Sequence, residues 1–269
     1  MAATATRPTQ GHSLVHFANV TRSELRKLRS VRSTYWALTA AVTFNIVTAA
    51  LLGIFLPRAL SAHQRAVIDS TRVSLGGLHL SQVAIGLLGV LVITSEYSTG
   101  MIRATLAAVP RRRLMLTAKT LVFAVAAVIA GIAACFAAYL IFQALLPSDA
   151  GMRTSLSDPG VLRAVTGAGL YLAVLGLFGL GLGTIIRSSA GAVATLFGVL
   201  FVPSILMTLL PASWQDTASR YLSMNAGETI YTVQHQPHTL QPWTGLGVFC
   251  LYAAAALATG FILINHRDA

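Results

Sequence analysis

The sequence has few charged residues. Only 10% of its 269 residues are Asp, Glu, Lys or Arg, whereas about 25% is usual in a soluble domain. Hydrophobic residues make up 55% of the chain, and the mean hydropathy is +0.71. A chain with this composition cannot keep most of its surface in water, so the composition excludes an ordinary soluble domain and predicts a membrane protein.

Motifs for catalysis and nucleotide binding are also missing. No Gly-x-x-x-x-Gly-Lys-Ser/Thr phosphate loop occurs, and neither lysine, Lys27 or Lys119, follows a glycine-rich turn. The hydrolase patterns His-Glu-x-x-His and Gly-x-Ser-x-Gly are absent, and no hydrophobic segment holds a pair of acids. We therefore expect a chain that is not an enzyme, with no catalytic residue and no ATP site or other cofactor of its own.

Cysteine is scarce as well. Cys135 and Cys250 both fall inside hydrophobic segments, and neither has a second Cys or His at ligand spacing. This pattern favours two buried thiols over a disulfide or a metal site. The first thirteen residues have no apolar core, so no cleavable signal peptide is expected.

Hydrophobic segments are what the sequence does contain. Six segments of 21 to 27 residues have no Asp, Glu, Lys or Arg, and about 20 residues are enough for a helix to cross a bilayer. They do not alternate as barrel strands do, so they predict an all-α membrane protein with six transmembrane helices. The predicted spans are 35–56, 75–95, 120–146, 164–186, 188–210 and 242–265.

The net charge of +11 is unevenly distributed along the chain. With a cytoplasmic N-terminus, thirteen Lys and Arg residues fall on the cytoplasmic side and six on the other. This is the bias that orients membrane proteins, and six spans bring the C-terminus back to the cytoplasm. The basic excess therefore indicates membrane topology rather than nucleic-acid binding. Seventeen arginines against two lysines favour a high-GC bacterial source, so we expect a multi-pass protein of a bacterial plasma membrane.

The chain before the first span divides into two parts. Residues 1–13 are polar and are predicted to be a disordered tail. Residues 14–34 are predicted to hold an amphipathic cytoplasmic interface helix, which would lie at the lipid headgroups. A solvated linker is the alternative. The predicted apolar face consists of Leu14, Phe17, Ala18, Leu25 and Leu28, with Arg22, Arg26, Lys27 and Arg29 elsewhere.

The loop 96–119, between the second and third spans, is short, basic and partly apolar. A helix through it would place Met101, Ile102, Thr105, Leu106 and Val109 on one face, and Pro110 would end it. Such a face beside the arginines at 111–113 is typical of a docking element, and nothing else in the chain offers it a partner. The alternative is that these arginines only mark the cytoplasmic side.

Two further residues of this loop have expected roles. Glu96 would cap the start of the helix or pair with Arg103 or a later arginine. Gly100 would permit the close approach of a partner backbone.

Residues Glu96, Gly100, Pro110, Arg113 and Lys119 resemble the same loop in permease subunits of type-2 ATP-binding-cassette exporters, and residues 23–36 resemble the lead-in to their first span. The resemblance covers essentially the whole chain and implies the type-2 exporter fold. Met101 departs from it, since threonine is frequent at that place. The implied ATPase-coupling residues are Glu96, Tyr97, Gly100, Met101, Ile102, Arg103, Leu106, Pro110 and Arg113.

The resemblance also implies a function. Two permeases and two ATPase subunits would form the exporter, with ATP and Mg²⁺ on the ATPase subunits and a second copy or a homologue as the other permease. The cargo would be a drug, an antimicrobial peptide or another amphiphile, which suggests a role in antibiotic resistance. The alternative is a membrane scaffold or immunity protein that sequesters a toxic peptide without transporting it.

Two places leave alternatives open. The external loop 211–241 contains a segment, 222–231, that resembles the short re-entrant helices of these permeases, and an ordinary surface loop is equally compatible with the sequence. Asn45, near the middle of the first span, is the candidate for a side chain on the substrate path. A hydrogen bond between helices is the alternative for Asn45.

Overall fold

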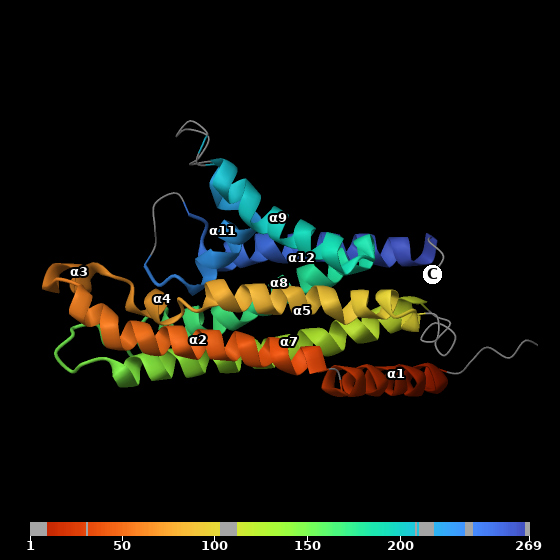
Figure 1. Ribbon diagram of the computed structural model, residues 1–269, viewed down its shortest axis with the longest axis horizontal. Coiled ribbons are helices and arrows are strands. Elements are labelled where there is room, and N and C mark those ends of the chain that lie inside the picture. The colour runs from red at the N-terminus through yellow and green to blue at the C-terminus, as the bar shows by residue number, and fades with distance from the viewer. Residues whose placement is uncertain are drawn as a thin grey trace, which may run out of the picture.

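The computed structural model describes residues 10–30, 32–102, 112–207, 209, 218–234 and 239–266. Within these ranges the chain is helical throughout and contains no β-strand. The long helices run side by side along one axis and form an elongated bundle (Figure 1).

Six helices are long and apolar enough to cross a membrane, which confirms the predicted number of spans. Each overlaps most of one of the six hydrophobic segments, and all but α9 continue beyond it at one or both ends. The predicted third span, 120–146, is the clearest case, because its helix begins eight residues earlier, at Arg112. The six are α2 (Arg32–Ala59), α5 (Leu78–Ser98), α7 (Arg112–Leu145), α8 (Val161–Ile186), α9 (Ser189–Met207) and α12 (Pro242–His266).

Helix α8 lies at the centre of the bundle and packs against α5, α7 and α12. Glycine makes this close packing possible. A Cβ atom on Gly89 of α5 would lie 2.0 Å from the carbonyl oxygen of Gly176 on α8, and one on Gly131 of α7 would lie 2.7 Å from that of Gly169. Small residues at such crossings let helix backbones approach within van der Waals contact.

The outer faces of the bundle are apolar. Ile129 of α7, Ile205 of α9 and Leu251 of α12 expose 63% to 70% of their surface. Side chains of this kind favour hydrocarbon over water. Together with the six helices, they indicate a multi-pass membrane protein.

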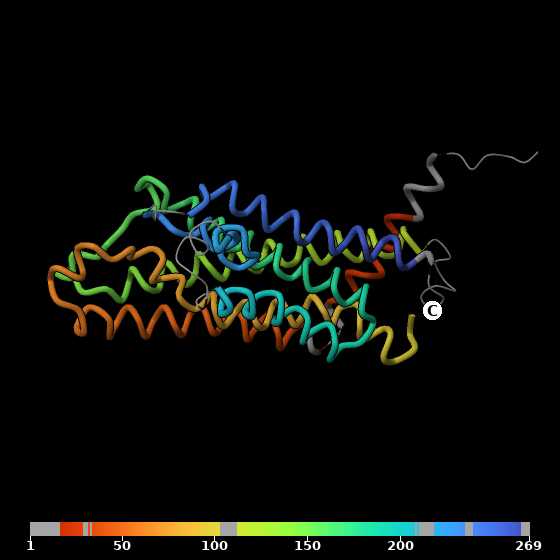
Figure 2. The backbone as a smooth tube through the Cα atoms, turned by 90° about the horizontal axis from the view of Figure 1, so that it is seen from above, coloured from red at the N-terminus to blue at the C-terminus, as the bar shows by residue number. Residues whose placement is uncertain are grey.

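Helix α1 (Gln10–Ser30) begins earlier than the predicted residue 14 and packs mainly against α7. Its contact face differs from the predicted apolar face. Val20 and Glu24 are buried, whereas Leu25 is 41% exposed. The spacing of apolar residues did not predict this face, because a glutamate occupies it and is neutralised there by neighbouring charges. Helix α1 lies at the same end of the bundle as the C-terminus, at an angle to the long helices (Figure 2).

Short helices form the opposite end. Helices α3 (Ala62–Val67) and α4 (Ser70–Ser74) join α2 to α5. Part of the predicted loop 211–241 folds into η1 (Ser219–Tyr221), α11 (Ser223–Glu228) and η2 (Thr229–Tyr231).

Helices α11 and η2 pack into the protein, whereas η1 has no buried residue. Ala226 and Ile230 are fully buried, and Arg163 of α8 donates to the carbonyl oxygens of Ile230 and Thr232 at 2.8 and 2.9 Å. Protein therefore shelters this irregular backbone, which is the condition that a re-entrant segment has to meet. Residues 211–217 and 235–238 of the predicted loop lie outside the described residues.

Candidate functional site

The loop between α5 and α7 is shorter in the structure than the predicted range, 96–119. Helix α5 continues to Ser98 and α7 begins at Arg112, so Glu96 and Tyr97 belong to α5, and Arg113 and Lys119 belong to α7. Hydrophobic segments reveal the part of a helix that crosses a membrane, but a helix continues past it where its polar residues find partners. The predicted site residues Arg103, Leu106 and Pro110 lie outside the described residues.

Four charged side chains meet where α1, α5 and α7 converge. The ammonium of Lys119 on α7 lies 2.6 Å from a carboxylate oxygen of Glu24 on α1 and 2.8 Å from one of Glu96 on α5. The ammonium of Lys27 on α1 lies 2.9 Å from Glu24 and 3.1 Å from Glu96. We call these four residues the ion cluster. It joins three helices that are far apart in the sequence.

Burial makes the ion cluster important for the stability of the protein. Glu24, Glu96 and Lys119 are only 3% to 5% exposed. Charges taken out of water are tolerated where they are paired and hydrogen-bonded, and removing one partner of a buried pair commonly costs about 3–5 kcal/mol. The two carboxylates and two ammonium groups balance. Each helix end is therefore held in place by charges on the other two.

Lys27 is the most accessible member, with 30% of its side chain exposed. Its partial burial lowers the pKa, but hydrogen bonds and attraction from Glu24 and Glu96 outweigh burial and raise the pKa above its ordinary value. The side chain therefore carries its charge throughout the neutral range.

Most of this cluster was not predicted from the sequence. Glu96 was expected to cap a cytoplasmic helix or to pair with Arg103 or a later arginine, yet it is buried and its partners are Lys27 and Lys119. Glu24 was not considered. One signal was available, because the cluster uses both lysines of the chain and two of its three glutamates. An amine presents one compact charge that two carboxylates can share, whereas a planar guanidinium spreads its charge over a fork.

The turn after α5 contains the next predicted site residues. Gly100 has a φ of +69°, the left-handed region that glycine adopts without strain, and a Cβ there would meet nothing within 4 Å. The backbone conformation at this position thus favours glycine. The predicted shared face of Met101 and Ile102 is divided, since Ile102 is 4% exposed and Met101 is 49% exposed.

The neighbouring residues connect this turn to the rest of the same end. The guanidinium of Arg187, between α8 and α9, lies 5.2 Å from the ring centre of Tyr97, within the range of a cation–π contact. Arg112, the first residue of α7, donates to the carbonyl oxygen of Ile264 in the last turn of α12 at 3.1 Å. Arg113 is exposed. Side chains of α5, α7 and α12, and Arg187 after α8, therefore interact where the predicted coupling segment leaves α5 and joins α7.

Asn45, the candidate for the substrate path, is fully buried between α2 and α5. Its amide nitrogen donates to the hydroxyl of Ser81 at 2.8 Å, and that hydroxyl lies 2.7 Å from the carbonyl oxygen of Ala41. This is the hydrogen bond between helices that was the alternative for Asn45. A role on the substrate path stays a prediction.

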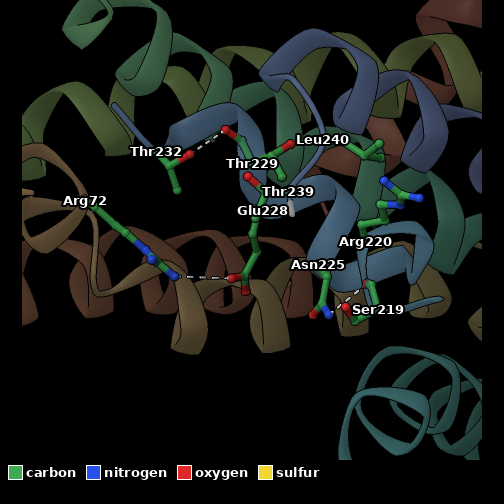
Figure 3. A pocket seen from close by; sticks show the side chains of 9 residues that line it. All are labelled: Arg72, Ser219, Arg220, Asn225, Glu228, Thr229, Thr232, Thr239 and Leu240. Carbon is green, nitrogen blue, oxygen red and sulfur yellow. Dashed lines mark hydrogen bonds and ion pairs between the residues drawn. The ribbon is translucent and has the colours of Figure 1, made fainter. Parts of the chain in front are cut away.

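A polar pocket of about 220 Å³ lies at the opposite end of the bundle (Figure 3). Glu228, at the end of α11, points toward Arg72 of α4, and the closest N···O distance is 4.0 Å. His79 in the first turn of α5 lies 3.5 Å from the other oxygen of Glu228. These contacts are longer and more exposed than those of the ion cluster.

No group of three His, Cys, Asp or Glu residues within the described ranges is arranged to hold a metal ion. Cys135 is buried and Cys250 is exposed on α12, so the expected burial holds for only one of the two thiols. No protein-family model matches the chain, and no curated protein matches it. Its function is therefore inferred from the geometry and from the resemblance of its motifs.

Proposed function

We propose that the chain is the permease subunit of an ATP-driven exporter of the type-2 ATP-binding-cassette class, moving a drug, antimicrobial peptide or other amphiphile out of a bacterial cell. The working unit would contain two permeases and two ATPase subunits. ATP and Mg²⁺ would bind to the ATPase subunits, because the sequence has no phosphate loop.

The observation that carries the proposal is the position of the ion cluster. The segment that resembles a coupling helix lies between the end of α5 at Ser98, two residues after Glu96, and the start of α7 at Arg112, seven residues before Lys119. The side chains of Glu96 and Lys119 are 2.8 Å apart. A force applied to that segment would therefore act on α5 and α7 together, and through Glu24 on α1. A transmission element needs this kind of connection to several helices at once.

The orientation of the chain also supports the proposal. Helix α1 and the C-terminus lie at one end of the bundle (Figure 1), and the sequence places most Lys and Arg residues at that end. The excess of positive charge predicts that this end is cytoplasmic. A partner that hydrolyses ATP is available only on that side.

Cysteine labelling tests the orientation. After Cys135 and Cys250 are replaced by Ser, single cysteines at Ala66 and Ser157 should react in whole cells with a thiol reagent that does not cross membranes. A cysteine at Thr99 should react only after the cells are opened, and all three positions are exposed. Labelling of Thr99→Cys in intact cells would contradict the proposal, because the segment would then face away from the ATPase.

A non-transporting immunity protein is the competing function. Cells that express the chain together with its cognate ATPase are compared with cells in which the catalytic glutamate of that ATPase is replaced. For a panel of antibiotics and antimicrobial peptides, the proposal predicts resistance and reduced accumulation of at least one compound, both lost with the inactive ATPase. Protection that persists without ATP hydrolysis would instead support sequestration.

A further inference from the structure

A groove lined by apolar side chains runs along the outside of the bundle between α1, α2 and α7. Its volume is about 560 Å³. Helix α7 contributes Leu121, Val125 and Ile129, which are 45%, 52% and 65% exposed. The three residues are spaced four apart in the sequence, so their side chains lie along one face of the helix. The groove thus offers a continuous apolar surface on the side that faces lipid.

The groove continues into a smaller hollow of about 180 Å³ at the ion cluster. Leu28, Thr34 and Leu88 line both spaces. All four members of the ion cluster line the smaller hollow. A molecule in this site would therefore lie with its apolar part in the groove and its polar part beside the charges.

One buried acceptor on a residue that lines the hollow lacks a partner. Lys27 and Lys119 both contact the same oxygen of Glu96, whereas its second carboxylate oxygen has no hydrogen-bond partner in the described part of the chain. The residue is 5% exposed. Buried polar atoms are nearly always satisfied by protein, water or ligand. A positively charged N–H donor fits this position best, because hydrogen bonds between charged groups are stronger than those between neutral groups.

The charge and the length of the site indicate which kind of ligand it can bind. The ion cluster is already neutral, so a headgroup without net charge disturbs it least. From Lys119 to Ala133, which ends the groove on α7, a helix rises about 21 Å at 1.5 Å per residue. One leaflet of a hydrocarbon core of about 30 Å is about 15 Å thick. The groove is therefore long enough for the acyl chain of a lipid from the leaflet nearest the ion cluster.

We propose that this site binds a zwitterionic phospholipid with a primary ammonium headgroup, an ethanolamine lipid. Its ammonium donates to the free oxygen of Glu96, and an acyl chain occupies the groove between α1, α2 and α7. The bound lipid completes the hydrogen bonding of the ion cluster. This binding is a property of the permease chain alone and does not depend on the ATPase.

Native mass spectrometry of the full chain in detergent tests the headgroup. The probes are lysophosphatidylethanolamine and lysophosphatidylcholine with the same acyl chain, which differ only in methylation of the nitrogen, so that choline has no N–H to donate. We expect the ethanolamine form to bind about tenfold more tightly, as one hydrogen bond to a charged acceptor allows. The mono- and dimethylated headgroups should bind more tightly than choline but no more tightly than ethanolamine. Equal binding of ethanolamine and choline forms would overturn the proposal.

Two substitutions assign that preference to Glu96. In Glu96→Gln the lysines keep the amide oxygen, the amide nitrogen then faces the ligand as a donor, and the preference for ethanolamine should disappear. Glu24→Gln removes the same charge from the same cluster but leaves the free oxygen of Glu96, so the preference should remain. If Glu96→Gln retains the full preference, the headgroup binds elsewhere and the proposal fails. The methylation series on the unmodified chain tests the same point should either variant fail to fold.

A third variant tests the groove. Val125→Trp fills it and should weaken both lysolipids at least fivefold, whereas Leu140→Trp, at a similarly exposed place on α7 outside the groove, should leave binding unchanged. The same spectra report whether two copies associate. If Val125→Trp alters that association but not lipid binding, the groove is an interface between copies and the lipid proposal is wrong.

Discussion

Glu96 and Glu228 occupy similar places at opposite ends of the bundle, and their surroundings differ. Each lies at the end of a helix between two basic side chains. Around Glu96 the N···O distances are 2.8 and 3.1 Å and one partner, Lys119, is 4% exposed. Around Glu228 they are 3.5 and 4.0 Å, and the partners His79 and Arg72 are 53% and 39% exposed.

The difference has a physical consequence. Exposed ion pairs contribute little, typically about 0–1 kcal/mol, because water screens the charges and the side chains lose conformational freedom. A buried group whose partner is removed is left as an uncompensated charge in a medium of low dielectric constant. The end with α1 should therefore depend strongly on its charges, and the end with α11 should not.

The largest expected effect separates the two ends directly. Lys119→Ala leaves Glu24 and Glu96 sharing Lys27 alone and should lower the free energy of unfolding by about 3 kcal/mol or more. Arg72→Ala at the other end should lower it by at most about 1 kcal/mol. Reversible unfolding in mixed micelles with dodecyl sulfate measures both. Equal losses of unfolding free energy in the two variants would contradict the difference between the two ends.

A compensated variant sharpens the same point. Glu24→Gln combined with Lys119→Met removes one charge of each sign, and Lys27 and Glu96 still pair. We expect it to be more stable than Lys119→Ala, with a coupling free energy of about 1 kcal/mol or more in the double-mutant cycle of these two substitutions. Additive losses in the cycle would mean that the two side chains do not interact.

A smaller effect is expected from two adjacent arginines at the ion-cluster end. Arg112 donates to the carbonyl oxygen of Ile264, and Arg113 is exposed. Arg112→Ala should cost about 1 kcal/mol of stability through the lost hydrogen bond, and Arg113→Ala should cost less than about 0.5 kcal/mol. The same unfolding assay compares them. A larger loss for Arg113→Ala would contradict the described contact.

The six long helices were predictable because membrane spans are encoded locally. About twenty consecutive apolar residues are sufficient to recognise each one, whatever its neighbours. Segment ends were less predictable. Helix α7 begins at Arg112, before the predicted span, because Arg112 and Lys119 find partners in the tertiary structure.

The ion cluster could not be predicted from local patterns. Glu24, Glu96 and Lys119 come from three helices, and only their packing reveals that they pair. The positive φ of Gly100 is a property of the turn itself and was not predicted, and the approach of a partner at Gly100 stays a prediction. The face by which α1 packs against the protein was not predicted for a related reason, since the spacing of apolar residues cannot show that Glu24 will be neutralised on the buried side.

The turnover of the cognate ATPase, measured beside this chain in lipid nanodiscs, tests the central claim most directly. The isolated chain should hydrolyse no ATP, and adding it to the ATPase should change that subunit's turnover. Gly100→Leu strains a left-handed turn at a cost of about 1–3 kcal/mol and should abolish this effect, whereas Gly100→Asn, which tolerates the same φ, should largely retain it. An ATPase whose turnover is the same with the unmodified chain, with Gly100→Leu and with no chain at all would contradict the account.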